Sequence, residues 1–224
     1  MDSAIKTTPR KIHTRQLTTT AMLCAVAYIA VFIGKIVPNV AGFLSYDPKD
    51  AVVVIGGFIF GPVTALIISV IVSFIEMITI SGTGVYGMIM NIFSTCAFAI
   101  PAALVYKRMR SMKGAIVGLV SGVAAMAVVM VLWNWIITPV YMGVPRAVVV
   151  GMLPTVFLPF NLVKGGINAT ITLLLYKPII TALRKANLVQ SAPTQGAKVN
   201  LAVTIGAVVV LAAFVAGLVM LITG

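Results

Sequence analysis

The stretch LPFNLVKGGIN, residues 158–168, decides how this sequence is interpreted. It lies within an apolar run, residues 152–176, that is otherwise typical of a membrane-spanning helix. Lys164 interrupts the run, which contains no acidic residue to balance the charge. A lysine at the centre of a membrane helix costs roughly 3 kcal/mol on insertion scales. A lysine retained at that position favours a buried site that binds a ligand or lines a cavity.

The composition is that of an integral membrane protein. Of the 224 residues, 61% are hydrophobic and 9% are charged, and the mean hydropathy is +1.14. A soluble domain of this length cannot bury so much apolar surface. The apolar runs are too long for transmembrane strands, so we predict an all-α protein that crosses the cell membrane several times.

The basic residues predict the orientation of the chain. The net charge is +12, and twelve of the 16 Lys and Arg lie in three clusters that flank apolar runs. This positive-inside pattern places the clusters and the N-terminus in the cytoplasm, where they also favour anionic lipid. The charge is therefore not interpreted as a nucleic-acid surface. The clusters occupy residues 6–15, 107–113 and 177–198.

Six apolar segments are expected to form a helical bundle over residues 17–185. The second segment has only about ten residues, which is short for a crossing, so we expect it to extend back towards Pro48 or to be shielded by its neighbours. The first segment is long for a cleavable signal and is expected to be retained. The six segments are residues 17–37, 51–60, 62–80, 85–106, 114–140 and 152–176.

The remaining parts of the chain are a tail, a loop, a linker and one more helix. Residues 1–16 form the basic cytoplasmic tail, and residues 38–50 are expected to be an outer loop. Residues 186–198 include a stretch rich in small and polar residues that predicts a linker. Residues 199–222 are apolar throughout and long enough to add a C-terminal transmembrane helix.

Catalytic and metal-binding patterns are absent from the sequence. The chain has four acidic residues and one histidine, and it contains no zinc-protease, nucleophile-elbow or phosphate-loop motif. Cys24 and Cys96 lie in apolar runs and are expected to be free thiols. We therefore expect no enzyme, no metal site and no resident cofactor. Uphill transport would draw its energy from a partner or from an ion gradient.

Four polar residues are expected to meet in the outer half of the bundle. Asn161 and Lys164 are three residues apart and share one helix face, while Asn134 and Glu76 lie at a similar depth in other helices. Two amides supply paired donors and acceptors, and the lysine supplies three donors. This set suits the edge of a heterocycle with alternating carbonyl and N–H groups. Trp133, Trp135, Phe157, Phe160 and several Met are expected to supply a slot for flat rings.

Each of these polar residues has a structural alternative. Glu76 could neutralise the buried lysine directly. Asn134 lies between Trp133 and Trp135, which could form an interfacial aromatic belt. Asn168, one turn deeper than the lysine, is expected to form a hydrogen bond between helices. Snorkelling of the lysine is disfavoured because it lies far from both helix ends.

At these residues the sequence resembles the riboflavin-specific substrate-binding (S) components of the energy-coupling factor (ECF) vitamin transporters. The motifs that carry the resemblance cover most of residues 17–185, and the last of them is the most specific. They are FLSYDPKD (43–50), IGGFIFGP (55–62), GVYGMIMNIFST (84–95) and LPFNLVKGGINATITLLLYKPI (158–179).

The resemblance implies a six-helix S-component bundle that binds riboflavin near its outer side. It implies that three side chains hydrogen-bond the pyrimidine-like edge of the ring system. It also implies that the first outer loop forms part of the pocket and its lid. The implied ring-binding residues are Asn134, Asn161 and Lys164, and the implied loop residues are Leu44, Tyr46 and Asp47.

The resemblance also implies partners. Ala21 and Ala25, two small residues four apart in the first span, would face the transmembrane coupling subunit EcfT, and two ATPase subunits would complete the transporter. In the family the S component topples in the membrane to carry the vitamin inward. The helix expected at residues 199–222 departs from the family pattern, and its role is left open.

Other ligands and other modes of transport are alternatives at this stage. The same scaffold could bind another vitamin or FMN, for which Lys49 and Arg146 are candidate cations at the outer rim. The chain could instead be a stand-alone secondary transporter that uses Glu76 as a proton carrier. That alternative predicts uptake by the chain alone, and loss of this uptake with an uncoupler or with Glu76→Gln.

Overall fold

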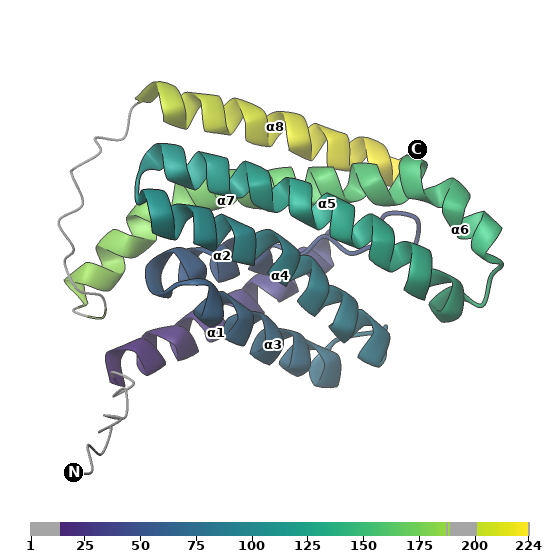
Figure 1. The fold of residues 1–224 in the computed structure, drawn as a ribbon, viewed down its shortest axis with the longest axis horizontal. Helices are drawn as coiled ribbons and strands as arrows, with labels where there is room; N and C mark the ends of the chain where they lie inside the picture. The colour runs from purple at the N-terminus through teal and green to yellow at the C-terminus, as the bar shows by residue number, and fades with distance from the viewer. Residues whose placement is uncertain (1–13, 187, 189–200, 224) are drawn as a thin grey trace, which may run out of the picture.

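The structure is a computed structural model that describes residues 14–186, 188 and 201–223. Most of the expected N-terminal tail and most of the expected linker at residues 186–198 lie outside the described residues. The helices lie alongside one another in a bundle (Figure 1). In chain order they are α1 (Thr14–Ile36), α2 (Lys49–Phe60), α3 (Pro62–Thr79), α4 (Gly84–Met109), α5 (Met112–Met142), α6 (Arg146–Met152), the π-helical turn η1 (Leu153–Phe157), α7 (Leu158–Lys185) and α8 (Leu201–Thr223).

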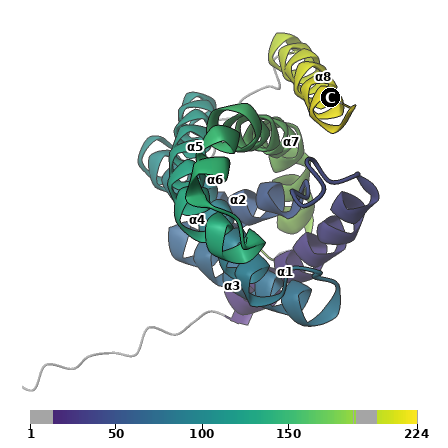
Figure 2. The same ribbon diagram turned by 90° about the vertical axis from the view of Figure 1, so that its right-hand side faces the viewer.

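Helix α2 lies at the centre of the bundle. Figure 2 looks along the bundle and shows α2 enclosed by the long helices. Its 12 residues span about 18 Å, which is too short to cross a bilayer. The first ten of them, from Lys49 to Phe58, are buried. The expectations that this segment extends back to Pro48 and is shielded by its neighbours are therefore both confirmed.

Two kinds of glycine allow the helices to lie close together. Gly61 has a φ of 98°, which favours glycine, and it turns the chain from α2 into α3 just before Pro62. Gly118 lies where α5 meets α4, and a Cβ there would be 2.7 Å from the carbonyl oxygen of Ala102. Small residues at such crossings allow the helix backbones to approach each other, as is common in membrane bundles.

The helical segment that contains the sixth expected span is longer than the apolar run at residues 152–176. Helices α6 and α7 are joined by the π-helical turn η1 into one candidate span, Arg146–Leu183. Pro154 lies in this turn and has no N–H for the regular ladder. Such single π turns inside α-helices are frequent at functional sites. Here the turn lies just before Phe160 and Asn161.

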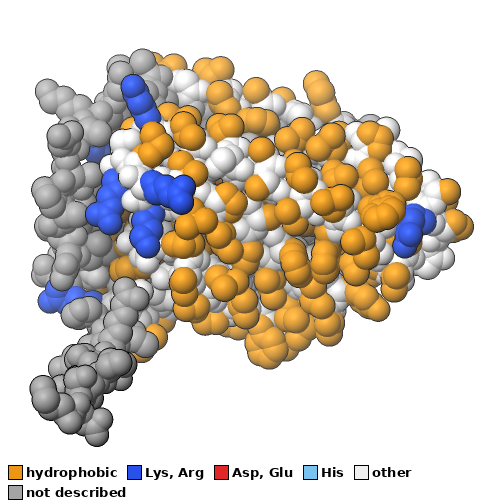
Figure 3. Space-filling view, in the orientation of Figure 1, with side chains coloured by type: hydrophobic (Ala, Val, Ile, Leu, Met, Phe, Trp, Pro, Cys, Tyr) orange, Lys and Arg blue, Asp and Glu red, His pale blue; other side chains and the backbone are white. Residues whose placement is uncertain are grey.

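The surface is apolar around the middle and basic at one end. Helices α1, α3, α4, α5, the α6–α7 segment and α8 are long and apolar enough to cross a membrane. Figure 3 shows hydrophobic side chains over most of the visible face, and Lys and Arg gathered near the end where α4 turns into α5. The three acidic residues within the described ranges, Asp47, Asp50 and Glu76, are all buried. The protein is therefore a multi-pass membrane protein.

Helix α8 lies on the outside of the bundle, against α7 (Figures 1 and 2). Only 6% of its most apolar 18-residue stretch is buried. One of its contacts is the ring of Phe214 against Gly166, where a Cβ would lie 2.5 Å from two ring carbons. The expected additional helix at residues 199–222 is therefore present as a peripheral helix.

Candidate functional site

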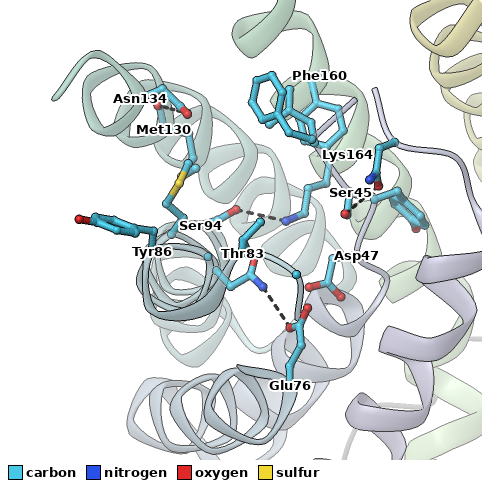
Figure 4. A pocket seen from close by; sticks show the side chains of 18 of the residues that line it. Ser45, Asp47, Glu76, Thr83, Tyr86, Ser94, Met130, Asn134, Phe160 and Lys164 are labelled. Carbon is cyan, nitrogen blue, oxygen red and sulfur yellow. Dashed lines mark hydrogen bonds between the residues drawn. The ribbon is translucent and has the colours of Figure 1, made fainter. Parts of the chain in front are cut away.

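A cavity of about 480 Å³ lies at the end of the bundle away from the α4–α5 turn. It is enclosed by the loop between α1 and α2 and by helices α1, α3, α4, α5 and α7. Its volume is in the range of small-molecule sites, about 300–1,000 Å³. In Figure 4, Asn134 and Phe160 lie at one end of the cavity, Glu76 and Asp47 lie at the other, and Lys164 lies between them.

The structure brings all six predicted substrate-binding residues to this cavity. The three polar residues of the bundle come from α5 and α7, and the other three come from the loop before α2. Glu76, which was expected at the same depth, also lines the cavity. The six residues are Leu44, Tyr46, Asp47, Asn134, Asn161 and Lys164.

Lys164 is buried and has a counterion in the second helix. Its Nζ lies 3.2 Å from Asp50 Oδ2 and donates to Ser94 Oγ at 3.3 Å. Asp50 lies only one residue into α2, in a segment interpreted from the sequence as an outer loop. The alternative that Glu76 neutralises the lysine is wrong, because Glu76 pairs with other lysines.

The side-chain amides of Asn134 and Asn161 are each held by a backbone carbonyl one turn earlier in the chain. Asn161 Nδ2 donates to Phe157 O at 2.7 Å, and Asn134 Nδ2 donates to Met130 O at 2.7 Å. Thr138 donates to Asn134 Oδ1 at 2.9 Å. Within the described chain, Asn161 Oδ1 accepts no hydrogen bond. The amide of Asn161 is therefore fixed in direction while its oxygen is available.

Glu76 organises the opposite end of the cavity. Its carboxylate lies 3.5 Å from Lys35 Nζ and 3.2 Å from Lys49 Nζ, and it accepts from Asn91 Nδ2 at 3.0 Å. Lys35 and Asn91 line the cavity, and sequence reasoning did not select either as a site residue. The signal for Asn91 was its position within the motif at residues 84–95. Lys35 gave no comparable signal, because it lies near the expected end of a span.

The two cations expected at the outer rim, Lys49 and Arg146, do not line the cavity. Lys49 is fully buried, and both its backbone N–H and its ammonium contact the Asp47 carboxylate. Arg146 stacks over the ring of Trp135 at 4.9 Å and does not line the cavity. The expectation that Lys49 is a free cation for a phosphate is therefore wrong. Its position at the start of α2 buries it among acidic groups.

The aromatic lining also differs from the expectation. Trp133 stacks on Phe93 with a centroid distance of 4.2 Å, and Phe157 packs against Phe43 at 5.9 Å. Neither Trp133 nor Trp135 nor Phe157 lines the cavity. Of the expected aromatic residues, Phe160 does. The others that line it come mainly from the loop and from helix ends: Phe43, Tyr46, Tyr86 and Tyr141.

The loop before α2 is anchored near its C-terminal end and contains a buried tyrosine hydroxyl. Asn168 Nδ2 donates to Asp47 O at 3.0 Å, so the bond expected between helices instead joins α7 to this loop. Tyr46 Oη is buried and has no partner among the described residues. Burial and the nearby Asp50 carboxylate raise the pKa of Tyr46, so its phenol stays protonated as a donor.

Ala21 and Ala25 lie on the exposed face of α1. The opposite face of the helix buries Leu23, Cys24 and Ala27. In the described part of the chain, no group of three or more His, Cys, Asp or Glu side chains could hold a metal ion.

Fold and cavity together define a multi-pass membrane protein with an enclosed small-molecule site. Residues 15–176 match the family described as "ECF transporter, substrate-specific component". This match covers more than half of the chain, so the chain belongs to that family of transporter components.

Relatives and a solved structure agree with this assignment. The chain is 27% identical to "Riboflavin transporter FmnP" of Bacillus subtilis (strain 168) over 78% of its own length and 98% of the relative. It is 28% identical to "Riboflavin transporter RibU" of Staphylococcus aureus (strain TCH60), over 79% and 97%. The solved "Structure and mechanism of the S component of a bacterial ECF transporter" has a TM-score of 0.65 at 28% identity, covering 76% of this chain and 98% of that one.

Proposed function

We propose that this chain is the riboflavin-binding subunit of an ECF-type transporter for vitamin uptake. The observation that carries the proposal is the cavity that Asn134, Asn161 and Lys164 line together. These groups offer the donors and acceptors that the pyrimidine-like edge of a flavin ring requires. The two relatives named as riboflavin transporters support the choice of ligand.

The two ends of the cavity fit the two parts of riboflavin. Phe160 and Met130 supply apolar contact beside the amides, where the flat ring would lie. The end with Lys35, Glu76 and Asn91 carries charged and amide groups that suit the hydroxyls of the ribityl chain. Lys35 and Lys49 at this end already pair with the carboxylates of Glu76 and Asp47, so neither lysine is a free cation for the phosphate of FMN.

The loop between α1 and α2 would act as part of the pocket and as its lid. Leu44 is buried, and Phe43 packs on Phe157, so the loop covers the cavity with apolar side chains. Tyr46 would contribute to the wall of the pocket, because its side chain lines the cavity. Asp47 would act mainly by holding the loop in place, because Lys49 already binds its carboxylate.

Uptake would require further subunits and one orientation. The basic end of the bundle would face the cytoplasm and the cavity would face outward. The exposed Ala21 and Ala25 would give the coupling subunit EcfT a smooth surface for close helix packing. Two ATPase subunits would supply the energy, and the chain itself would catalyse no reaction.

A spectrum of the detergent-purified protein, followed by fluorescence titration, tests the ligand. We expect a co-purified flavin or stoichiometric quenching of riboflavin, with weaker competition by FMN. A colourless protein that leaves flavin fluorescence unchanged contradicts the proposal, and other vitamins would then be screened against the same cavity.

An uptake assay tests the partners. Ala21→Leu or Ala25→Leu is expected to abolish uptake while binding is kept, and a loss of binding would place α1 in the pocket or the fold instead. Uptake by this chain alone, abolished by Glu76→Gln, would favour a proton-coupled transporter.

A further inference from the structure

The buried carboxylate of Asp50 lies directly behind the lysine of the cavity. Asp50 has no exposed surface, and it does not line the cavity, whereas Lys164 and Ser94 do. Its Oδ2 lies 3.2 Å from Lys164 Nζ, and its Oδ1 accepts from Thr95 Oγ1 at 2.5 Å. The three groups come from α2, α4 and α7. The carboxylate therefore reaches the cavity only through the lysine.

The position of Asp50 suits an anion. It lies in the first turn of α2, where the helix dipole stabilises negative charge. The hydroxyl of Thr95 fixes one carboxylate oxygen and directs the other towards the ammonium group. An isolated ammonium in this interior would be expensive, so a paired carboxylate lowers the cost of keeping Lys164 charged.

The same contacts restrict where Lys164 can point. A lysine side chain has a flexible four-carbon stem and three rotatable donors. Here Asp50 and Ser94 hold the ammonium group on one side, within 3.3 Å. The remaining donor capacity is available to a ligand in the cavity. A carbonyl oxygen with a neutral charge fits this better than an anion, because Asp50 already balances the ammonium.

We infer that Asp50 is the positioning residue of this binding site, and that it sets ligand affinity by holding the Lys164 ammonium directed at a carbonyl oxygen of the ring. The inference rests on the proposed function, since riboflavin supplies that carbonyl. Thr95 contributes by fixing the carboxylate. Asp50 itself does not touch the ligand.

A double-mutant cycle on the full chain tests this inference by riboflavin fluorescence titration. Asp50→Asn keeps the shape and the acceptor for Thr95 but removes the charge. We expect it to weaken binding by at least about tenfold, the lower range for loss of a charged hydrogen bond. In the Lys164→Met background, Asp50→Asn should change affinity by less than about twofold, because the group through which it acts is gone. An equal loss in both backgrounds, or no loss in the wild-type background, overturns the inference.

Lumiflavin keeps the flavin ring but has no ribityl chain, so a comparison of the two ligands separates effects at the ring from effects at the ribityl chain. Asp50→Asn should weaken riboflavin and lumiflavin by the same factor, because Lys164 is proposed to bind the ring, which both ligands share. Glu76→Gln should weaken riboflavin more than lumiflavin. A loss with Asp50→Asn that is confined to riboflavin contradicts the inference.

Two further measurements guard against misfolding and against failure of the proposed function. Thr95→Val retains the charge pair and is expected to weaken binding by a smaller factor than Asp50→Asn in protein that stays monodisperse. If Asp50→Asn does not fold, unchanged affinity in Thr95→Val overturns the inference. If the wild-type chain binds neither flavin, the proposed function fails and the inference fails with it. If the wild type binds riboflavin and Asp50→Asn binds it with the same affinity, this inference is overturned and the proposed function stands.

Discussion

Helices α7 and α8 lie side by side and are both part of spans long and apolar enough to cross a membrane, but they differ in their polar content and in what they contact. Helix α7 has 28 residues and buries polar groups against four other parts of the fold. Helix α8 has 23 residues, and Leu218 is its one buried residue among those described. The difference shows that the polar residues of a membrane helix are the ones that mark its specific contacts, because each buried polar group requires a specific partner.

Three consecutive residues of α7 show how closely this helix is specified. Lys164 points into the cavity and pairs with Asp50. Gly165 faces α5, where a Cβ would lie 2.7 Å from the end of the Met126 side chain. Gly166 receives the ring of Phe214 from α8. Each residue therefore faces a different neighbour, whereas most residues of α8 face outward.

The largest contrast is expected between Lys164 and an exposed residue of α8. Lys164→Ala should weaken riboflavin binding by about 1.5–3 kcal/mol, because it removes a charged donor. Val209→Ala, at a side chain that is 62% exposed, should leave affinity unchanged in the same fluorescence titration. Equal affinities for the wild type and Lys164→Ala would remove the lysine from the site.

A smaller effect is expected where α7 anchors the loop. Asn168→Leu removes the bond to the Asp47 carbonyl and should lower the free energy of unfolding by about 1–1.5 kcal/mol. It should also speed proteolysis within residues 37–48. Thr181→Val serves as the control, because its exposed hydroxyl bonds only to its own helix. A shift in thermal unfolding no larger than that of the control would mean that the anchor is unimportant.

The contact between α7 and α8 can be tested by whether a substitution at Gly166 destabilises or stabilises the protein. Gly166→Ala should destabilise the full chain by about 0.5–1 kcal/mol, since crowding of Phe214 outweighs the gain in helix propensity. In a chain without residues 201–224 the same change should be neutral or stabilising. Gly206→Ala, whose added Cβ meets open space, should not destabilise the full chain. Identical unfolding shifts with and without α8 would contradict this packing.

The smallest effect is expected from removing α8 altogether. Among the residues of α8 that the structure describes, none lines the cavity, and the family match ends at residue 176. Deletion of residues 201–224 should therefore change riboflavin affinity by less than about twofold, which corresponds to a difference in binding free energy of about 0.4 kcal/mol. A tenfold loss in the truncated protein would show that α8 supports the cavity through α7.

Much of the architecture could be predicted from local patterns. Apolar run lengths located the long helices, and the three-residue spacing of Asn161 and Lys164 placed both on one face. The depths of Asn134 and Glu76 then predicted that all four would meet, and all four line one cavity. These predictions succeed because helix geometry converts sequence distance directly into position along and around one helix.

The sequence by itself thus determined the membrane class, the long spans and the polar set of the cavity. Only the tertiary structure decided which charges pair. Lys164 meets Asp50, Lys49 meets Asp47 and Glu76, and Lys35 enters the cavity. The aromatic lining likewise comes from the loop and from other helix residues, including Phe160, rather than from the tryptophans. Periodicity orders side chains around one helix, but partners on different helices depend on how the helices are rotated and crossed, and that is settled by packing of the whole bundle.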